Sequence, residues 1–278
     1  MPETPPIETL PLFAELDRLL LQLLRSLQPA DWRRPTLARQ WTVQDVAAHL
    51  LDGNLRTLSM LRDGHFGEAP NDTSYGGIVA YLNQLNADWV RAARRLSPAV
   101  LVGLLAQSGA EYTAYLHTLD PWAPAAFAVG WAGENKSLNW FHIARDYTEK
   151  WHHQQQIREA VGQPAPLLAP RFFRPFIETV MRGLPHAYRQ VSAPVGTRVQ
   201  VVVRTEAGGI WELVCTPEGW QLQPPAGAVP AASVTLAPAD AWPLFTKGLN
   251  ATEVRAHAVV AGDEQLAMAA LRMAAVMG

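Results

Sequence analysis

Helical periodicity dominates the first 162 residues of the chain: apolar residues recur three and four positions apart, and no strand-like alternation interrupts them. Proline or glycine falls between the helical segments, for example at Pro29 and at Ser97-Pro98. Long helices with short joints bury their apolar faces against one another, so this stretch predicts an up-and-down or crossed helical bundle. The predicted helices cover residues 7–28, 43–63, 75–96, 98–118 and 135–161.

The pattern changes after Gly162-Gln163-Pro164, which ends the last long helix and is typical of a joint between domains. Short β-branched runs separated by glycine and proline turns then predict a small antiparallel sheet. These runs lie at 199–204, 210–215 and 233–236, and further helices are expected at 171–190, 238–247 and 263–277. The predicted fold class is therefore multi-domain, α followed by α+β. The domains are expected at 1–165 and 196–278, with a connecting helix or linker at 166–195.

Composition excludes several classes of protein. A net charge of −2 and the absence of long basic runs argue against a nucleic-acid partner. No apolar stretch is long enough for a membrane span, and the acidic, proline-rich start lacks the features of an export signal, so a cytoplasmic location is expected. The single cysteine, Cys215, excludes an internal disulfide and a cysteine-based zinc site. A thiol used by this protein is therefore expected to come from outside the chain.

His49 lies two turns into a predicted helix whose start is well marked. Thr42 is a suitable N-cap residue, and Asp45 three positions later completes an acidic variant of the capping box. On a helical projection His49 falls at the margin of the apolar stripe, where its side chain can point into a bundle. The alternative is a histidine at the edge of the core, bonded to a backbone carbonyl or to water.

Glu149 and His153 are four residues apart on the last long helix, so their side chains share one face and can reach one metal ion. His142 projects onto the same stripe, whereas His152 projects away from it and is interpreted as structural. The alternative is that this stripe is the solvated face of an amphipathic helix, because Glu-x-x-x-His is common by chance.

Two segments together carry a family resemblance: the Trp-Thr-Val-Gln-Asp-Val-Ala-Ala-His-Leu motif at 41–50, and the Glu-x-Trp-His-His-Gln-Gln-Gln-Ile-Arg motif that begins at Glu149. They resemble the DinB-like superfamily, and within it the mycothiol-dependent maleylpyruvate isomerase family. The resemblance implies a four-helix bundle with a metal, expected to be zinc, on His49, Glu149 and His153. The segment at 259–267 resembles the closing strand and helix of that family's sterol carrier protein-like domain.

The resemblance further implies a low-molecular-weight thiol as cosubstrate and a small electrophilic substrate, hence a thiol-dependent S-transferase or isomerase. Nickel, manganese or iron could replace zinc on such ligands. Arg145, Arg158 and Arg255 are candidates for binding a substrate carboxylate. One position departs from the family: Gln156 stands where its members often carry an aspartate that can orient a ligand.

Two other functions stay open. The first is a non-catalytic protein that binds a metal and carries an apolar ligand in its C-terminal domain. The second is a metal-dependent hydrolase, in which activated water attacks an ester or amide. A monomer or a homodimer is compatible with each of the three.

Overall fold

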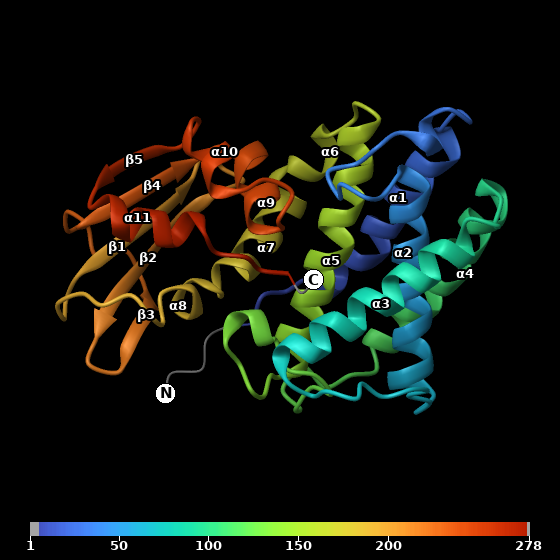
Figure 1. Cartoon of the computed structure of the whole chain (residues 1–278), viewed down its shortest axis with the longest axis horizontal. Coiled ribbons are helices and arrows are strands. Elements are labelled where there is room, and N and C mark those ends of the chain that lie inside the picture. Colours follow the sequence, from blue (N-terminus) through green and yellow to red (C-terminus); the bar gives the residue numbers. More distant parts are fainter. Residues whose placement is uncertain (1–5, 277–278) are drawn as a thin grey trace.

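A computed structural model describes residues 6–276 of the chain and confirms a helical N-terminal part followed by a part built on a sheet (Figure 1). The predicted helices of the first part are present, although they are shorter than predicted by up to two turns. They are α1 (Phe13–Ser26), α2 (Val43–Thr57), α3 (Tyr75–Ala93), α4 (Pro98–Leu116) and α5 (Asn139–Ala160). Single turns flank them: η1 (Leu10–Leu12), η2 (Asp31–Arg33), η3 (Leu58–Arg62) and η4 (Gly130–Ala132).

The predicted capping box at the start of α2 is confirmed. The Thr42 side chain accepts a hydrogen bond from the backbone N–H of Asp45, and the Asp45 carboxylate accepts one from the backbone N–H of Thr42 at 3.1 Å. Arg94, at the end of α3, donates to the same carboxylate at 2.9 and 3.1 Å. The cap therefore fixes both the first turn of α2 and the position of α2 against α3.

Helices α2 and α5 pack directly against each other. Ile157 of α5 is fully buried in one hydrophobic cluster with Val46 of α2, Leu24 of α1 and Leu101 of α4. Because α5 is enclosed by α1 and α2 on one side and by later helices on the other, polar residues along its length are buried as well. This enclosure places the polar side chains of α5 inside the protein.

The C-terminal part holds one mixed sheet of order β3-β2-β1-β4-β5. The prediction of an antiparallel sheet was wrong in one respect, because β1 and β4 pair in parallel. After the β1–β2–β3 meander, the segment 224–231 returns along the sheet before β4 begins, and such a return gives β4 the direction of β1. The strands are β1 (Arg198–Val203), β2 (Gly209–Thr216), β3 (Gly219–Gln223), β4 (Ala232–Leu236) and β5 (Val259–Gly262).

Three helices accompany the sheet: α9 (Pro238–Phe245), α10 (Ala251–Arg255) and α11 (Glu264–Leu271). The short elements β3 and α10 were not predicted. The helix predicted over 263–277 ends earlier, at Leu271, and its last residue lies outside the described residues, as do the predicted outer domain ends at 1 and 278.

The helix predicted at 171–190 is divided into α7 (Pro170–Met181) and α8 (Leu184–Ala187), after the short α6 (Ala165–Leu168). The break at Gly183 coincides with a close contact, since a Cβ atom there would lie 3.2 Å from the Trp131 ring. A glycine at this point lets the chain pass close to the indole.

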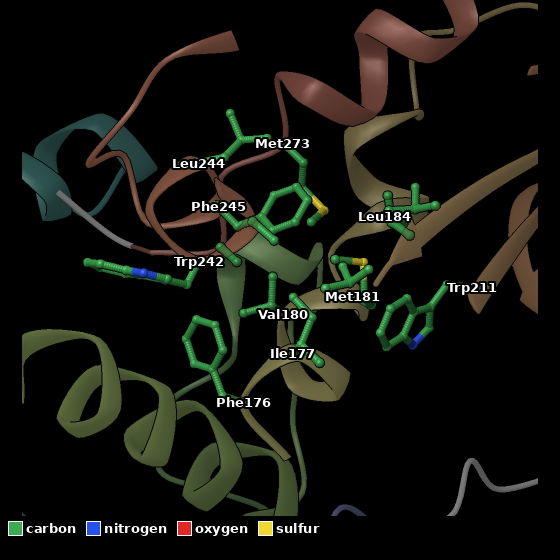
Figure 2. Close-up of a cluster of buried hydrophobic side chains, with 14 of the residues drawn as sticks. Phe176, Ile177, Val180, Met181, Leu184, Trp211, Trp242, Leu244, Phe245 and Met273 are labelled. Atoms are coloured by element: carbon green, nitrogen blue, oxygen red, sulfur yellow. The ribbon is translucent and has the colours of Figure 1, made fainter. Parts of the chain in front are cut away.

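Helix α7 forms the junction between the two parts of the molecule. Phe176 of α7 stacks on Trp151 of α5 with ring centroids 4.0 Å apart, and Trp242 of α9 contacts the same indole edge-on at 6.0 Å. Figure 2 shows Phe176, Ile177 and Val180 beside Trp242 and Phe245 in this cluster. One hydrophobic core thus extends through both parts and holds one face of α5 against α7.

Among the described residues, no helix combines the length and the apolar character that a membrane crossing requires.

Candidate metal centre

A group of potential metal ligands lies on α5. Glu149, His152 and His153 each offer one ligand atom, and the three atoms lie within 4.8 Å of one another. Within this group, Oε2 of Glu149 is 3.7 Å from Nε2 of His153. Both histidines are buried. Carboxylate oxygens and imidazole nitrogens at this proximity are the donors that zinc and similar divalent ions prefer.

Gln156 orients the His153 ring. Nδ1 of His153 donates to Oε1 of Gln156 at 2.9 Å, so the lone pair of the neutral imidazole is on Nε2, the nitrogen nearest Glu149. An acceptor on the far nitrogen of a ligating histidine fixes its tautomer and ring angle. The amide oxygen of Gln156 can therefore orient the ring as an aspartate would, although it brings no negative charge.

His152 lies within the cluster, which differs from the structural position expected for it. Its Nδ1 donates to the backbone carbonyl of Thr148 at 2.8 Å, and its ring centroid is 3.9 Å from that of His153. Side chains on an α-helix lean toward its N-terminus, so the His152 ring covers the preceding turn, where Glu149 lies. A projection of Cα positions alone misses this lean. The adjacent pair His152-His153 was the available signal in the sequence.

His49 of α2 lies beside the cluster rather than within the group of three. Its ring centroid is 4.6 Å from that of His153, at an interplanar angle of 76°. Trp41 covers another side of His49, with centroids 4.8 Å apart. Nδ1 of His49 is buried and has no hydrogen-bond partner among the described residues. A buried imidazole nitrogen without a partner is costly, and a cation nearby would relieve this cost.

Burial sets the protonation of these groups. It lowers the pKa of His152 to about 4 and that of His153 to about 3, and it lowers the pKa of His49 as well. At neutral pH the three imidazoles are therefore uncharged, as metal binding requires. Burial also raises the pKa of Glu149, although His153 and Arg145 act in the opposite direction. This donor set fits a divalent cation, whose charge would stabilise the half-buried carboxylate of Glu149.

Of the three arginines proposed for substrate binding, Arg145 lies closest to the cluster. It belongs to the turn of α5 before Glu149, and its Nη2 is 2.8 Å from Oδ1 of Asp146. The hydroxyl of Tyr112 donates to the other oxygen of Asp146 at 2.6 Å. Arg145 is therefore held in place by a carboxylate that is itself anchored to α4.

The other two arginines have partners elsewhere. Arg158 is buried and donates to the carbonyl of Leu19 at 3.1 Å, so its guanidinium joins α5 to α1. Arg255, at the end of α10, forms an ion pair with Glu264 at 3.3 Å within the C-terminal part. These contacts support structural roles, and a role in substrate binding stays a prediction for both.

The model of the mycothiol maleylpyruvate isomerase N-terminal domain matches residues 13–158. No curated protein matches the chain. Two crystal structures, of the mycothiol-dependent maleylpyruvate isomerase and of a point mutant of it, match in fold. Each is 15% identical with a TM-score of 0.53, and the match covers 86% of this chain and 88% of the other. The family model spans more than half of the sequence and all three predicted ligands, and the chain therefore belongs to the mycothiol maleylpyruvate isomerase N-terminal domain family.

Proposed function

We propose that the protein is a metal-dependent enzyme that uses a low-molecular-weight thiol to isomerise a small electrophile or to transfer the thiol to it. The observation that carries this proposal is the cluster of the half-buried Glu149 with the buried His152 and His153, beside His49 and inside the region matched by the family model. The crystal structures of similar fold are of an isomerase whose name includes mycothiol dependence. Mycothiol and maleylpyruvate are therefore the first thiol and substrate to test.

His49, Glu149 and His153 are the proposed protein ligands, and zinc is the proposed metal, with nickel, manganese or iron as alternatives. When bound, such a metal lowers the pKa of a coordinated thiol, which then provides a thiolate nucleophile near neutral pH.

The chain's own residues prepare the site in three ways. Gln156 fixes the tautomer of His153 that presents Nε2. Trp41 packs against the His49 ring, with ring centroids 4.8 Å apart, and so limits the positions that this ring can take. Arg145, held by Asp146, supplies a positive charge one turn from Glu149, where it could bind a carboxylate group of the substrate.

We expect residues 1–165 to form a DinB-like four-helix bundle that holds the metal, and residues 196–278 to form a sterol carrier protein-like domain. The stretch 166–195 was predicted as a connection, and its helix α7 also carries the core shared by both parts. A cytoplasmic monomer or homodimer without a nucleic-acid or membrane partner is part of this proposal.

The alternative of a ligand carrier finds its support in a groove of about 760 Å³ beside α11. Polar side chains contribute to its lining, among them Asp263, Glu264 and Arg272. A mixed lining of this kind does not match the mostly apolar walls of typical small-molecule pockets. We therefore rank the carrier function below the enzymatic one.

Metal analysis tests the proposed function. Elemental mass spectrometry of the purified full chain should find about one metal ion per chain. His49→Ala, Glu149→Ala and His153→Ala should each lose it, whereas His65→Ala, a substitution at an exposed loop histidine, should retain it. Isomerisation that requires added thiol would support the proposal. Hydrolytic turnover without thiol would favour the hydrolase, and a metal-free protein would remove the enzymatic proposal.

A further inference from the structure

We propose that His152 is an additional metal ligand, so that an incoming thiol has to compete with an imidazole of the protein for its place on the metal. This inference rests on the proposed metal centre and deepens it. The observation behind it is that His152, and not His49, forms the close group with Glu149 and His153. The family resemblance predicted His49, Glu149 and His153 as ligands and gave no role to His152.

The hydrogen bonds of the two adjacent histidines favour this assignment. A backbone carbonyl can only accept, so Nδ1 of His152 must carry the proton that it donates to Thr148. The remaining nitrogen, Nε2, then carries the lone pair. His153 has the same arrangement, with Gln156 as its acceptor. Both rings thus have the tautomer of a ligand that binds through Nε2 and is oriented through Nδ1.

His49 lacks this orientation. Its Nδ1 is buried without a partner, and no backbone carbonyl or side chain of the described residues fixes its tautomer. Judged by its hydrogen bonds, His152 is better prepared to bind a metal than His49 is. The two residues approach His153 from different elements, since His49 comes from α2 and His152 from α5.

The distances allow His152 to join the other ligands. Donor atoms bound at about 2.1 Å to one tetrahedral ion are about 3.4 Å apart. One ligand atom from each of Glu149, His152 and His153 already lies within 4.8 Å of the other two, which is close to this spacing. With His49 added, the centre would have four protein donors, which fills a tetrahedral coordination shell.

The consequence concerns access to the metal. A centre with three protein ligands leaves one place open for a thiol, whereas a centre that includes His152 has this place occupied in the resting protein. Removal of His152 should therefore weaken the binding of metal and strengthen the binding of a thiol. A purely structural histidine would not change these two quantities in opposite directions.

The test uses the full chain loaded with Co²⁺, whose visible absorption reports its coordination. Two variants are compared with the wild type: His152→Ala, and His152→Gln, which keeps a donor for the Thr148 carbonyl and so protects the fold. We expect Co²⁺ to bind more weakly in both variants, by on the order of 10- to 100-fold in competition with a chelator. We also expect an altered visible spectrum, and tighter binding of 2-mercaptoethanol, measured by its sulfur-to-cobalt charge-transfer band.

The exposed substitution His65→Ala is the matched control, and circular dichroism verifies that each variant is folded. If His153→Ala loses Co²⁺ while both His152 variants keep the affinity and spectrum of the wild type, His152 is not a ligand and the metal centre stands without it. If the wild type fails to bind Co²⁺ or Zn²⁺, the proposed function fails together with this inference.

Discussion

Two carboxylates on α5, those of the buried Asp146 and the half-buried Glu149, lie about one turn apart and have opposite surroundings. Asp146 accepts a hydrogen bond from Tyr112 at 2.6 Å and pairs with Arg145 at 2.8 Å. Burial acts to raise the pKa of Asp146, but its cationic and hydrogen-bonding neighbours outweigh it, and the pKa is lowered. Glu149 faces Nε2 of His153 at 3.7 Å, and burial raises its pKa. The comparison separates a carboxylate that stabilises the fold from one that is positioned to bind a cation.

The largest change in stability is expected for replacement of Asp146, and replacement of Glu149 provides the comparison. Asp146→Asn leaves the guanidinium of Arg145 without its counter-ion in the protein, and such a loss costs about 3 kcal/mol of unfolding free energy. Glu149→Gln removes a half-buried charge that lacks a strong partner, so in metal-free protein it should change stability by less than about 1 kcal/mol. Urea unfolding in the presence of a chelator measures both. Equal losses of unfolding free energy in the two variants would contradict the different roles assigned to Asp146 and Glu149.

A smaller effect is expected for the partner of Asp146 on α4. Tyr112→Phe removes the hydroxyl that donates to the carboxylate, and hydrogen bonds to charged groups contribute about 1.5–3 kcal/mol. Tyr81→Phe provides the control. The hydroxyl of Tyr81 donates to the Glu68 carbonyl at an exposed position, so its loss should lower the free energy of unfolding by less than about 0.5 kcal/mol. Thermal and urea unfolding of the two variants should rank them in this order. The reverse order would show that Tyr112 does not anchor the network.

Local signals in the sequence predicted much of this architecture, and contacts between distant segments account for what they missed. The capping box of Thr42 and Asp45 involves neighbouring residues, so the start of α2 could be predicted. The parallel pairing of β1 with β4 depends on how segment 224–231 returns along the sheet, which strand periodicity does not encode. The role of α7 in a core common to both parts depends likewise on tertiary packing.

At the candidate site, too, local sequence predicted some features and missed others. The spacing of Glu149 and His153 predicted a shared face of one helix, and the two side chains do approach each other. The place of His152 depends on a side-chain rotamer fixed by the Thr148 carbonyl, and helical projection does not include rotamers. The partners of Asp146 could not be predicted either, because Tyr112 belongs to a helix that precedes it by more than thirty residues.

Substitutions of Gln156, the residue that orients His153, should change the affinity for metal. Gln156→Glu replaces the amide acceptor with a carboxylate of the same length, which strengthens the bond to Nδ1 and makes His153 a better ligand. We expect Zn²⁺ to bind about tenfold more tightly, and Gln156→Met, which has no such acceptor, to bind it about tenfold more weakly. Competition with a chromophoric chelator measures both constants. Unchanged affinity in both variants would indicate that Gln156 does not orient a metal ligand.

The smallest expected effect is the pH dependence of the contribution that Asp146 makes to the free energy of unfolding. Since the folded-state pKa of Asp146 is lowered, its stabilisation is fully present above the unfolded-state pKa of about 3.9 and is lost as the pH falls through the folded-state value. The difference in unfolding free energy between the wild type and Asp146→Asn should therefore be constant from pH 7 down to about pH 4 and should narrow below it. Asp88→Asn is the control, because the Asp88 side chain is half-exposed and pairs with Arg91 at the surface. Urea unfolding between pH 3 and 7 measures this difference in unfolding free energy. If the difference stays constant throughout this range, the charge of Asp146 is not the source of its stabilising effect.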